Sequence, residues 1–216
     1  MSICAVVGAS PEFNEKHFLS KKFDYIIAVD GGFAYLEKLG IVSDIAMGDF
    51  DSLGYIPRLN RVVRFSEEKD FTDMERALQR AHTRSCDEIY VYGALGGRFD
   101  HSLYNMQACA AISEKGALVT LISLDTAIRF LTGPDVFQLP CRKEGLVSVI
   151  ALNDECLGVI EEGLKYRAED ISVTNRKTWG ISNEFIGSEY SCVALEQGTL
   201  GIIYPLEEES HTTKEV

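Results

Sequence analysis

Short runs of residues that are apolar at almost every position, rather than at alternate positions, recur through residues 1–126. Strands of this composition are buried on both faces, which is typical of a parallel sheet covered by helices. Helical patterns lie between the runs, and the clearest one follows a capping box formed by Thr72 and Glu75. The sequence therefore predicts an N-terminal, Rossmann-like, layered α/β domain with a mainly parallel sheet. The predicted strands are 3–8, 25–29, 45–47, 62–65, 88–92 and 117–122.

The pattern changes after residue 126. Helical periodicity fades, and short β-rich pieces separated by Gly, Pro, Asn and Asp take its place. Short strands with this spacing are typical of a small all-β sandwich or barrel. We therefore predict two domains, residues 1–126 and 127–216, with the boundary between Leu124 and Gly133, and we expect the polar end from Glu207 to Val216 to be frayed. The strands predicted in the second domain are 127–131, 145–152, 156–161, 171–174, 191–195 and 201–204.

Charge and composition narrow the possible functions. The chain carries 21 Lys and Arg against 33 Asp and Glu, a net charge of −12, and 46% of its residues are hydrophobic. A folded, acidic protein of this kind is a poor partner for nucleic-acid phosphates or for an anionic membrane surface. No apolar stretch reaches the ~18 residues of a membrane span, and the N-terminus lacks the pattern of a signal peptide. The six cysteines form no C-x-x-C pair, so we expect reduced thiols in a cytoplasmic protein.

Aspartates follow the predicted strands at the ends where ligands bind in open α/β sheets. Because these ends meet at one edge of the sheet, the carboxylates are expected to lie together. Six carboxylates cannot all remain ionised in a small cleft without a strong cation, and Mg²⁺ is the natural one because it binds both carboxylates and substrate phosphates. The sequence thus predicts a Mg²⁺-assisted site for a phosphate ligand. The aspartates are Asp30, Asp49, Asp51, Asp70, Asp73 and Asp100.

Asp49 and Asp51 flank Phe50 in the segment Gly48–Ser52. In an extended segment, residues two apart point to the same side, so the two carboxylates would form a pair of metal ligands while Phe50 turns away to pack. The alternative is an ordinary turn, since Gly-Asp and Asp-Ser are common loop dipeptides. The position directly after an apolar strand favours the metal ligands.

Lys69, Asp70 and Asp73 surround the start of the helix predicted after Thr72. An N-cap at Thr72 and a favourable interaction with the helix dipole explain Asp73. They give no reason for Lys69 and Asp70, which could instead bind a phosphate and the metal. Taken alone, this segment leaves both interpretations open.

The loop 93–98 joins a strand to a helix and contains three glycines. Glycine lets the backbone approach an anion, a helix N-terminus offers free N–H groups, and Arg98 adds a forked donor for phosphate. The loop matches neither the Walker A sequence nor G-x-G-x-x-G, so a standard dinucleotide fold is not expected. His101, just beyond the loop, is either a general base or a structural histidine bonded to a carboxylate.

Taken in order, these motifs resemble those of thiamine pyrophosphokinases of the bacterial type. The matching segments of the first half are Asp30–Gly32, Gly48–Ser52, Lys69–Asp73 and Gly96–His101 with Asn105. In the second half, Gly163–Tyr166 and Gly180–Phe185 are similar to the thiamine-binding segments of that family. The resemblance covers residues 26–204. Two positions depart from it, because Val42-Ser43 and Arg167 stand where the family often has proline.

The resemblance implies an enzyme that transfers the pyrophosphoryl group of ATP to the hydroxyl of thiamine and releases AMP. It also implies a homodimer, with ATP and Mg²⁺ bound by the α/β domain and thiamine bound by the β-domain. The implied catalytic residues are Asp49, Asp51, Asp70, Asp73 and Asp100, and all of these except Asp73 would hold Mg²⁺ or orient the hydroxyl. The implied ATP-binding residues are Asp30, Gly31, Lys69, Gly96, Gly97, Arg98, His101 and Asn105, and those for thiamine are Trp179, Ser182 and Asn183.

Three alternatives remain open from the sequence. Trp179 would stack on the thiamine cation or pack inside the β-domain. A Mg²⁺-dependent phosphohydrolase would use Asp49 as an aspartyl nucleophile and Asp51 as the acid and base. A non-catalytic, nucleotide-sensing dimer would bind ATP without turning it over. The products formed from ATP with and without thiamine separate these last two from the kinase.

Overall fold

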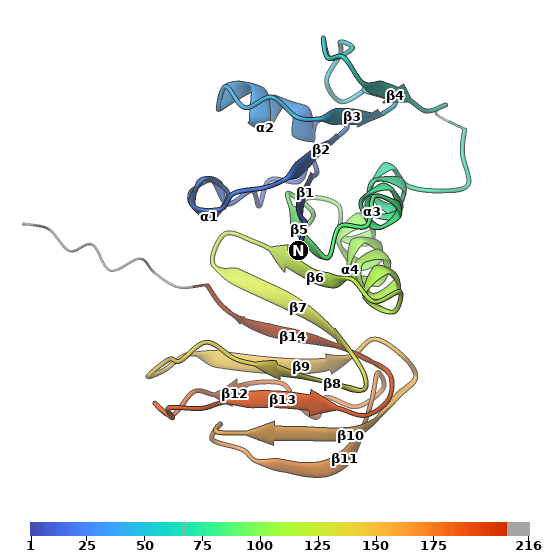
Figure 1. Cartoon of the computed structure of the whole chain (residues 1–216). Helices are drawn as coiled ribbons and strands as arrows, with labels where there is room; N and C mark the ends of the chain where they lie inside the picture. Colours follow the sequence, from blue (N-terminus) through green and yellow to red (C-terminus); the bar gives the residue numbers. More distant parts are fainter. Residues whose placement is uncertain (67, 207–216) are drawn as a thin grey trace, which may run out of the picture.

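Two β-sheets make up most of the protein (Figure 1). The computed structural model describes residues 1–66 and 68–206, so the end predicted to be frayed, Glu207–Val216, lies outside the described residues. One sheet has ten strands in the order β12-β9-β14-β7-β6-β5-β1-β2-β3-β4, and the other has four in the order β11-β10-β13-β8. The chain therefore has a mixed α/β fold in which strands predominate.

Six parallel strands form one half of the large sheet, in the order β4-β3-β2-β1-β5-β6. The neighbouring residues Ile27 and Ala28 point to opposite faces, and both are fully buried. Burial on both faces explains the uniformly apolar runs, and all six predicted strands are confirmed. They are β1 (Ile3–Val7), β2 (Tyr25–Val29), β3 (Ile45–Gly48), β4 (Val62–Arg64), β5 (Glu88–Tyr92) and β6 (Leu118–Ile122).

Helices cover both faces of this parallel half (Figure 1). On one face lie α3 (Asp73–Thr83) and α4 (Phe99–Ser113), and on the other lie α1 (Glu15–Ser20) and α2 (Gly32–Lys38). The N-cap half of the capping box is confirmed, because the Thr72 hydroxyl oxygen accepts the Glu75 N–H at 3.1 Å, whereas the Glu75 carboxylate accepts from the Gln79 side chain at 2.8 Å. The helix α1 was not predicted, because six residues with the single buried side chain Phe18 show no helical period. None of the helices in the described ranges has the length and apolar character needed to cross a membrane.

The strand order reverses between β1 and β5, so the connection after β1 leads to one side of the sheet and the connection after β5 leads to the other side. Their first residues, Gly8 and Gly93, are in close contact, since a Cβ on Gly93 would lie 2.3 Å from the Gly8 carbonyl oxygen. Gly93 also has a φ of +56°, a conformation that favours glycine. A crevice outside the carboxyl ends of the strands is the usual ligand site of such a sheet.

The large sheet continues without a break into the C-terminal half. The antiparallel hairpin of β6 and β7 pairs Ile122 with Ala127, so the predicted boundary at 126/127 falls inside a hydrogen-bonded ladder. Three further antiparallel strands extend the sheet beyond β7. The four strands are β7 (Thr126–Thr132), β14 (Thr199–Pro205), β9 (Leu146–Ala151) and β12 (Asn183–Glu184). The division into two domains stays a prediction.

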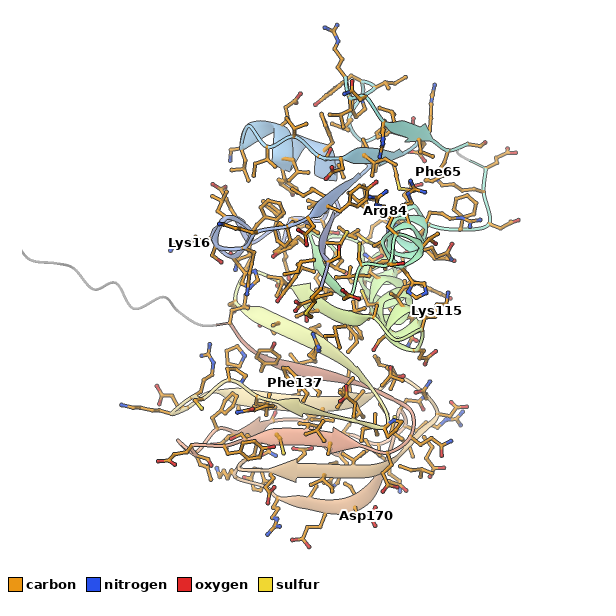
Figure 2. The ribbon with its side chains drawn as sticks, viewed as in Figure 1. Lys16, Phe65, Arg84, Lys115, Phe137 and Asp170 are labelled. Carbon is orange, nitrogen blue, oxygen red and sulfur yellow. The ribbon has the colours of Figure 1, made fainter. Side chains whose placement is uncertain are left out.

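The four-stranded sheet packs against the antiparallel half of the large one (Figure 1). Val149 and Ile202 of the large sheet share an apolar cluster with Val159 and Val193 of the small sheet. Phe137, labelled in Figure 2, also joins the sheets, because its ring centroid lies 5.7 Å from that of Tyr204 on β14. The small sheet contains β8 (Asp135–Gln138), β10 (Glu155–Glu162), β11 (Ala168–Thr174) and β13 (Cys192–Leu195). The sequence did not predict β8, whose side chains are mostly exposed, or β12, which has only two residues.

A half-buried histidine on α1, His17, makes the stability depend on pH. The Nδ1 atom of His17 lies 3.0 Å from the hydroxyl oxygen of the fully buried Tyr92. Burial, assisted by the charge of Lys21, lowers the pKa of His17 to about 4. An unfolded histidine titrates near pH 6.5. Between pH 6.5 and 4 the unfolded chain therefore binds a proton that the folded chain does not, so stability is lost as the pH falls through this range.

The variant His17→Gln is expected to lose less stability in acid than the wild type. The fall in the free energy of unfolding between pH 7 and pH 4.5 should be smaller by about 1–2 kcal/mol, because glutamine does not titrate. Urea denaturation at the two pH values measures this difference. His101→Gln, at an exposed position, is the control and should behave like the wild type. Equal acid losses in wild type and His17→Gln would contradict the prediction.

Candidate active site

The loop after β2 places Asp30 at the carboxyl edge of the parallel strands. Asp30 has a φ of +48°, and Gly31 follows it at the start of α2. The Ser52 hydroxyl donates a 2.7 Å hydrogen bond to Oδ2 of Asp30. Its other oxygen, Oδ1, is buried and has no hydrogen-bond partner among the described residues. The loop after β3 therefore orients Asp30 and leaves one of its acceptor atoms available.

Lys69 joins two aspartates from different elements. Its ammonium group donates to Oδ2 of Asp49 at 3.0 Å and to Oδ1 of Asp73 at 2.7 Å. Asp49 directly follows β3, and Asp73 is the first residue of α3. The three side chains are 11–21% exposed, so the cluster lies below the surface but remains open to a ligand. This arrangement explains Lys69, for which helix capping gave no reason.

The charges in this cluster do not balance. The hydrogen bond from Lys69 holds the pKa of Asp49 below its usual value, so Asp49 is ionised. Burial raises the pKa of Asp73, and the charges of Asp49 and Asp30 act in the same direction although Lys69 opposes them. Burial alone would lower the pKa of Lys69, but its bonds to the two aspartates outweigh this and raise it. The one ammonium group thus bonds to two carboxylates while a third acts on them through its charge, and an added cation is favourable there.

The segment Asp49–Asp51 is not extended, so that expectation is wrong. Phe50 has a φ of +64° and is buried, and the N–H of Asp51 donates to Oδ1 of Asp49 at 3.3 Å. A carboxylate that accepts from the backbone two residues on stabilises a turn. Phe50 packs in the core as predicted, while Asp51 is exposed. The two aspartates therefore lie on a turn at the end of β3 and not on one side of a strand.

A cavity of about 670 Å³ lies beside the cluster and includes Lys69 and the exposed Asp70 in its lining. Phe71 lies in the lining as well, with the Arg76 guanidinium 3.9 Å from its ring centroid. Phe65, labelled in Figure 2 on the stretch between β4 and α3, has its ring 5.5 Å from the Lys69 ammonium. The volume suits a small-molecule ligand. Lys69 lies between this space and the two aspartates it binds.

The glycine loop after β5 is held in place by a buried amide. The Asn105 side chain donates to the Ala94 carbonyl at 2.8 Å, so Asn105 anchors the loop from α4. Gly96 and Gly97 have φ values of +79° and +68°, and a Cβ on Gly96 would lie 3.1 Å from the Glu12 side chain. The loop then enters α4 without a side-chain cap from Arg98. The first turn of this 15-residue helix thus lacks a cap from the Arg98 side chain, and its N–H groups could bind an anion.

Arg98 and Asp100 form an exposed ion pair at the start of α4. The guanidinium donates from Nε at 3.1 Å and from Nη2 at 2.5 Å to the two carboxylate oxygens. This pairing lowers the pKa of Asp100 to about 2. The neighbouring His101 is exposed, and within residues 1–66 and 68–206 no hydrogen bond joins its ring to a carboxylate. The forked donor of Arg98 is therefore engaged with Asp100 and not directed at Lys69 or Asp49.

The predicted thiamine segment lies far from the aspartates along the large sheet. It leads into β12 at one edge, whereas the loops after β2 and β3 lie near the opposite edge (Figure 1). Trp179 is 43% exposed, so it is not packed in the core. Ser182 is exposed, with a φ of +63°, and its N–H donates to the Ser148 hydroxyl at 3.1 Å. Asn183 is buried and bonded to other parts of the chain. One chain does not bring the two predicted half-sites together.

The donor groups present are compatible with Mg²⁺ bound together with a nucleotide. In the part of the chain that the structure describes, no three acidic, His or Cys side chains come together closely enough to hold a metal. Mg²⁺ usually takes only one or two protein carboxylates and completes its shell with substrate phosphates and water. Asp49 and Asp51 lie on one turn, and Asp30 has an oxygen without a partner among the described residues, so these carboxylates could serve as such ligands.

Two residues that matter here were not singled out from the sequence. Ser52 orients Asp30, and Glu161 is a fully buried carboxyl bonded to Asn183. Ser52 was visible only as part of a motif, because its partner lies 22 residues away. Glu161 could have been found from the sequence, because it lies two residues after Val159 in a predicted strand and so on the same, inward face. A charged residue at such a position indicates a bonded, and therefore constrained, group.

The strand order of the parallel sheet reverses between β1 and β5, carboxylates lie at the carboxyl ends of the strands, and the N-terminus of α4 has no side-chain cap. This is the architecture of an enzyme that acts on a phosphate-containing ligand. Residues 17–121 match the family model of the thiamin pyrophosphokinase catalytic domain. Thiamine pyrophosphokinase of Bacillus subtilis is 30% identical over 169 residues, 75% of this chain and 78% of the relative. Thiamin pyrophosphokinase 1 of Caenorhabditis elegans is 25% identical over 205 residues, with 87% and 83% covered. This chain therefore belongs to the thiamine pyrophosphokinase family.

The fold agrees with this assignment. The crystal structure of the Bacillus subtilis thiamine pyrophosphokinase superimposes with a TM-score of 0.82 at 26% identity, covering 96% of this chain and 100% of that chain. Thiamin pyrophosphokinase from Candida albicans, at 17% identity, has the same fold with a TM-score of 0.76 over 95% of this chain and 89% of that one.

Proposed function

We propose that this chain transfers the pyrophosphoryl group of ATP to the hydroxyl of thiamine, giving thiamine diphosphate and AMP. Its family membership supports this reaction, and one structural observation carries it. At the carboxyl edge of the parallel strands, the Lys69 ammonium bonds to Asp49 and Asp73, and Asp30 adds a third carboxylate whose charge acts on Asp73. Pyrophosphoryl transfer needs positioning and charge neutralisation more than a covalent nucleophile, and this cluster is suited to both.

The chain's own residues would hold Mg²⁺ at the turn after β3. Asp49 and Asp51 are the proposed first ligands, with Asp70 and Asp100 at the edges of the same site. When bound, Mg²⁺ neutralises charge on the ATP phosphates during transfer. Asp73 keeps Lys69 in place through their 2.7 Å bond. Because Lys69 also bonds to Asp49, Asp73 helps to orient Asp49 indirectly. Among the carboxylates, Asp49 is the one that Lys69 keeps ionised, which suits a metal ligand.

The phosphates of ATP would lie against the glycine loop and the start of α4. The amides of Gly96 and Gly97 and the free N–H groups of α4 offer donors, and Arg98 is a further donor when it exchanges Asp100 for a phosphate. Asn105 acts by anchoring this loop. The rest of the proposed ATP site consists of Asp30, Gly31, Lys69 and His101.

Thiamine would be bound at a junction between two copies of the chain. The cation is attracted to the acidic cluster, and the exposed Trp179 and Ser182 offer a ring face and a hydroxyl. These residues lie at the opposite edge of the sheet from Asp49, which supports a homodimer in which each site uses both chains. The exposed apolar residues Phe99 and Tyr104 on α4 also suit an interface.

The proposed division of labour follows the two halves of the chain. Residues 1–126, the layered Rossmann-like part, would bind ATP and Mg²⁺, and the β-sandwich from residue 127 onward would bind thiamine. A cytoplasmic location belongs to the same proposal, and it is supported by six cysteines that are all free thiols, the state kept in a reducing compartment.

The products formed from ATP test the proposed reaction. AMP and thiamine diphosphate are expected in equal amounts, and only when thiamine and a divalent metal are both present. Chromatography of the nucleotides after incubation measures this. ADP in place of AMP would mean transfer of one phosphoryl group and would refute the proposal. Phosphate release without thiamine would indicate the phosphohydrolase, and ATP binding without any product would indicate the sensing dimer.

A further inference from the structure

Glu161 is a carboxyl group buried in the apolar space between the two sheets. It is fully buried on β10, and it points inward like Val159 two residues before it. The nearby cluster contains Leu164, Phe185 and Val193. A carboxyl is costly to bury unless it is hydrogen-bonded, so a specific partner is expected.

That partner is the side chain of Asn183 from the other sheet. The Asn183 amide donates to Oε2 of Glu161 at 2.6 Å, while Oε1 is buried without a partner in the described part of the chain. Glu161 lies on the four-stranded sheet and Asn183 lies on β12 at the edge of the ten-stranded sheet. The bond therefore crosses the space between the sheets. Burial raises the pKa of Glu161, yet both the neutral and the charged carboxyl offer an acceptor oxygen to Asn183.

Asn183 uses its remaining hydrogen-bonding groups on the backbone of two segments. Its amide also donates to the Tyr166 carbonyl at 2.8 Å, and its oxygen accepts the N–H groups of Tyr166 and Glu184, both at 2.9 Å. The Lys165 ammonium and the Glu184 carboxylate, 2.6 Å apart, add an ion pair between the same segments. The segments 163–166 and 180–185 thus form one unit, and Glu161 fixes that unit to the small sheet.

The exposed residues of this unit lie next to its fixed points. Gly180 has a φ of +88°, and its carbonyl accepts the Val149 N–H at 2.8 Å. Trp179 directly precedes Gly180 and Ser182 directly precedes Asn183, so both lie on a short turn that is held at these two residues. Tyr166, whose backbone is bonded to Asn183, is 58% exposed.

We propose that Glu161 is a positioning residue for thiamine, because it holds Asn183 and thereby fixes the turn that carries Trp179 and Ser182. This role rests on the proposed function, in which that turn contacts the thiamine ring. Glu161 itself is fully buried, so it would act through Asn183 and not by direct contact with a ligand. Its effect is therefore confined to how firmly the turn is held, and it should act on thiamine binding and not on ATP.

The test compares Glu161→Met with two controls. Methionine keeps the length of the side chain but cannot accept a hydrogen bond of normal strength from Asn183, whereas Glu161→Gln retains an acceptor oxygen. Glu162→Met is the matched control, since Glu162 is the next residue on the same strand and is exposed. In Glu161→Met the KM for thiamine should rise at least about fivefold with the KM for ATP unchanged. Glu161→Gln and Glu162→Met should stay within about twofold of the wild type.

Trp179 gives a second readout that does not depend on the reaction. It is the only tryptophan of the chain, so acrylamide quenching of its fluorescence reports how well the turn is ordered. Quenching should increase in Glu161→Met and remain as in the wild type in both controls. A wild type that makes no AMP would refute the proposed function, and the quenching comparison alone would then decide whether Glu161 fixes the turn.

Two results would overturn the inference. One is unchanged quenching and an unchanged KM for thiamine in Glu161→Met. The other is a general loss, in which both KM values rise together and the melting temperature falls, because Glu161 would then serve stability alone. If Glu161→Met does not fold, Glu161→Ala is measured in the same way, and failure of both variants to fold also overturns the positioning role.

Discussion

Replacing Asp49 with asparagine is expected to lower kcat/KM for pyrophosphoryl transfer at least about 100-fold, which corresponds to about 2.7 kcal/mol of lost transition-state stabilisation. Asparagine keeps the shape of the side chain and an acceptor for the Lys69 ammonium, but it removes the charge needed by a metal ligand. The fold should survive, because Asp49 lies at the sheet edge and the bond from Lys69 to Asp73 remains. The same loss is expected for Asp51→Asn.

AMP formation at saturating ATP and Mg²⁺ measures the activity, and urea denaturation measures the stability. Without metal, Asp49→Asn should lose a small part of the stability, because Lys69 stabilises the charged form of Asp49 and this ion pair is lost while the bond from Lys69 to Asp73 remains. Asp170→Asn is the control, since Asp170 lies on β11 at the opposite end of the molecule (Figure 2). Wild-type turnover by Asp49→Asn at ordinary Mg²⁺ concentration would refute the assignment of Asp49 as a ligand.

Gly93→Ala is expected to destabilise the protein by more than about 3 kcal/mol. Two effects add at this position. The φ of +56° disfavours any residue with a Cβ, and that Cβ would lie 2.3 Å from the Gly8 carbonyl oxygen. Relief of the contact requires the ends of β1 and β5 to move apart in the centre of the parallel sheet. The ligand loops that start there would move with them, so activity should fall as well.

Gly40→Ala separates these two effects. Gly40 has a φ of +67°, but an added Cβ would meet nothing within 4 Å. This control should cost only about 1 kcal/mol, the price of the backbone conformation alone. Urea denaturation of both variants gives the comparison. Equal losses in the two proteins would show that the close approach of Gly8 and Gly93 contributes nothing.

The parallel half of the fold could be predicted because its cause is local. A strand buried on both faces, such as 25–29, must be apolar throughout, and the cap at Thr72 needs only its own next three residues. The short helix α1 could not be predicted, since it is held by the packing of Phe18 and not by its own period. The continuation of the large sheet through β7 was also not visible, because strand pairing depends on partners far away in the sequence.

The candidate site shows the same division. The types and order of its residues were readable, since carboxylates at strand ends follow from the motif positions. Their partners were not, because the bond from Lys69 to Asp49 spans 20 residues and the one from Ser52 to Asp30 spans 22. The segment around Phe50 was expected to be extended, and it forms a turn instead. A positive φ at a non-glycine residue has no clear sequence signal. Asn183 was assigned to the ligand, and its buried partner Glu161 only emerged in three dimensions.

The hairpin of β6 and β7 makes the folding of each half of the chain depend on the other half. A chain cut at residue 126 would leave each fragment with an open row of backbone N–H and C=O groups along a long apolar strand, which invites association with other chains. A protein built in this way has little scope for exchanging one half for that of a relative or for swinging the halves on a hinge. This continuity agrees with the proposed homodimer, in which the distant thiamine segment reaches the aspartates of a second chain and no bending within one chain is required.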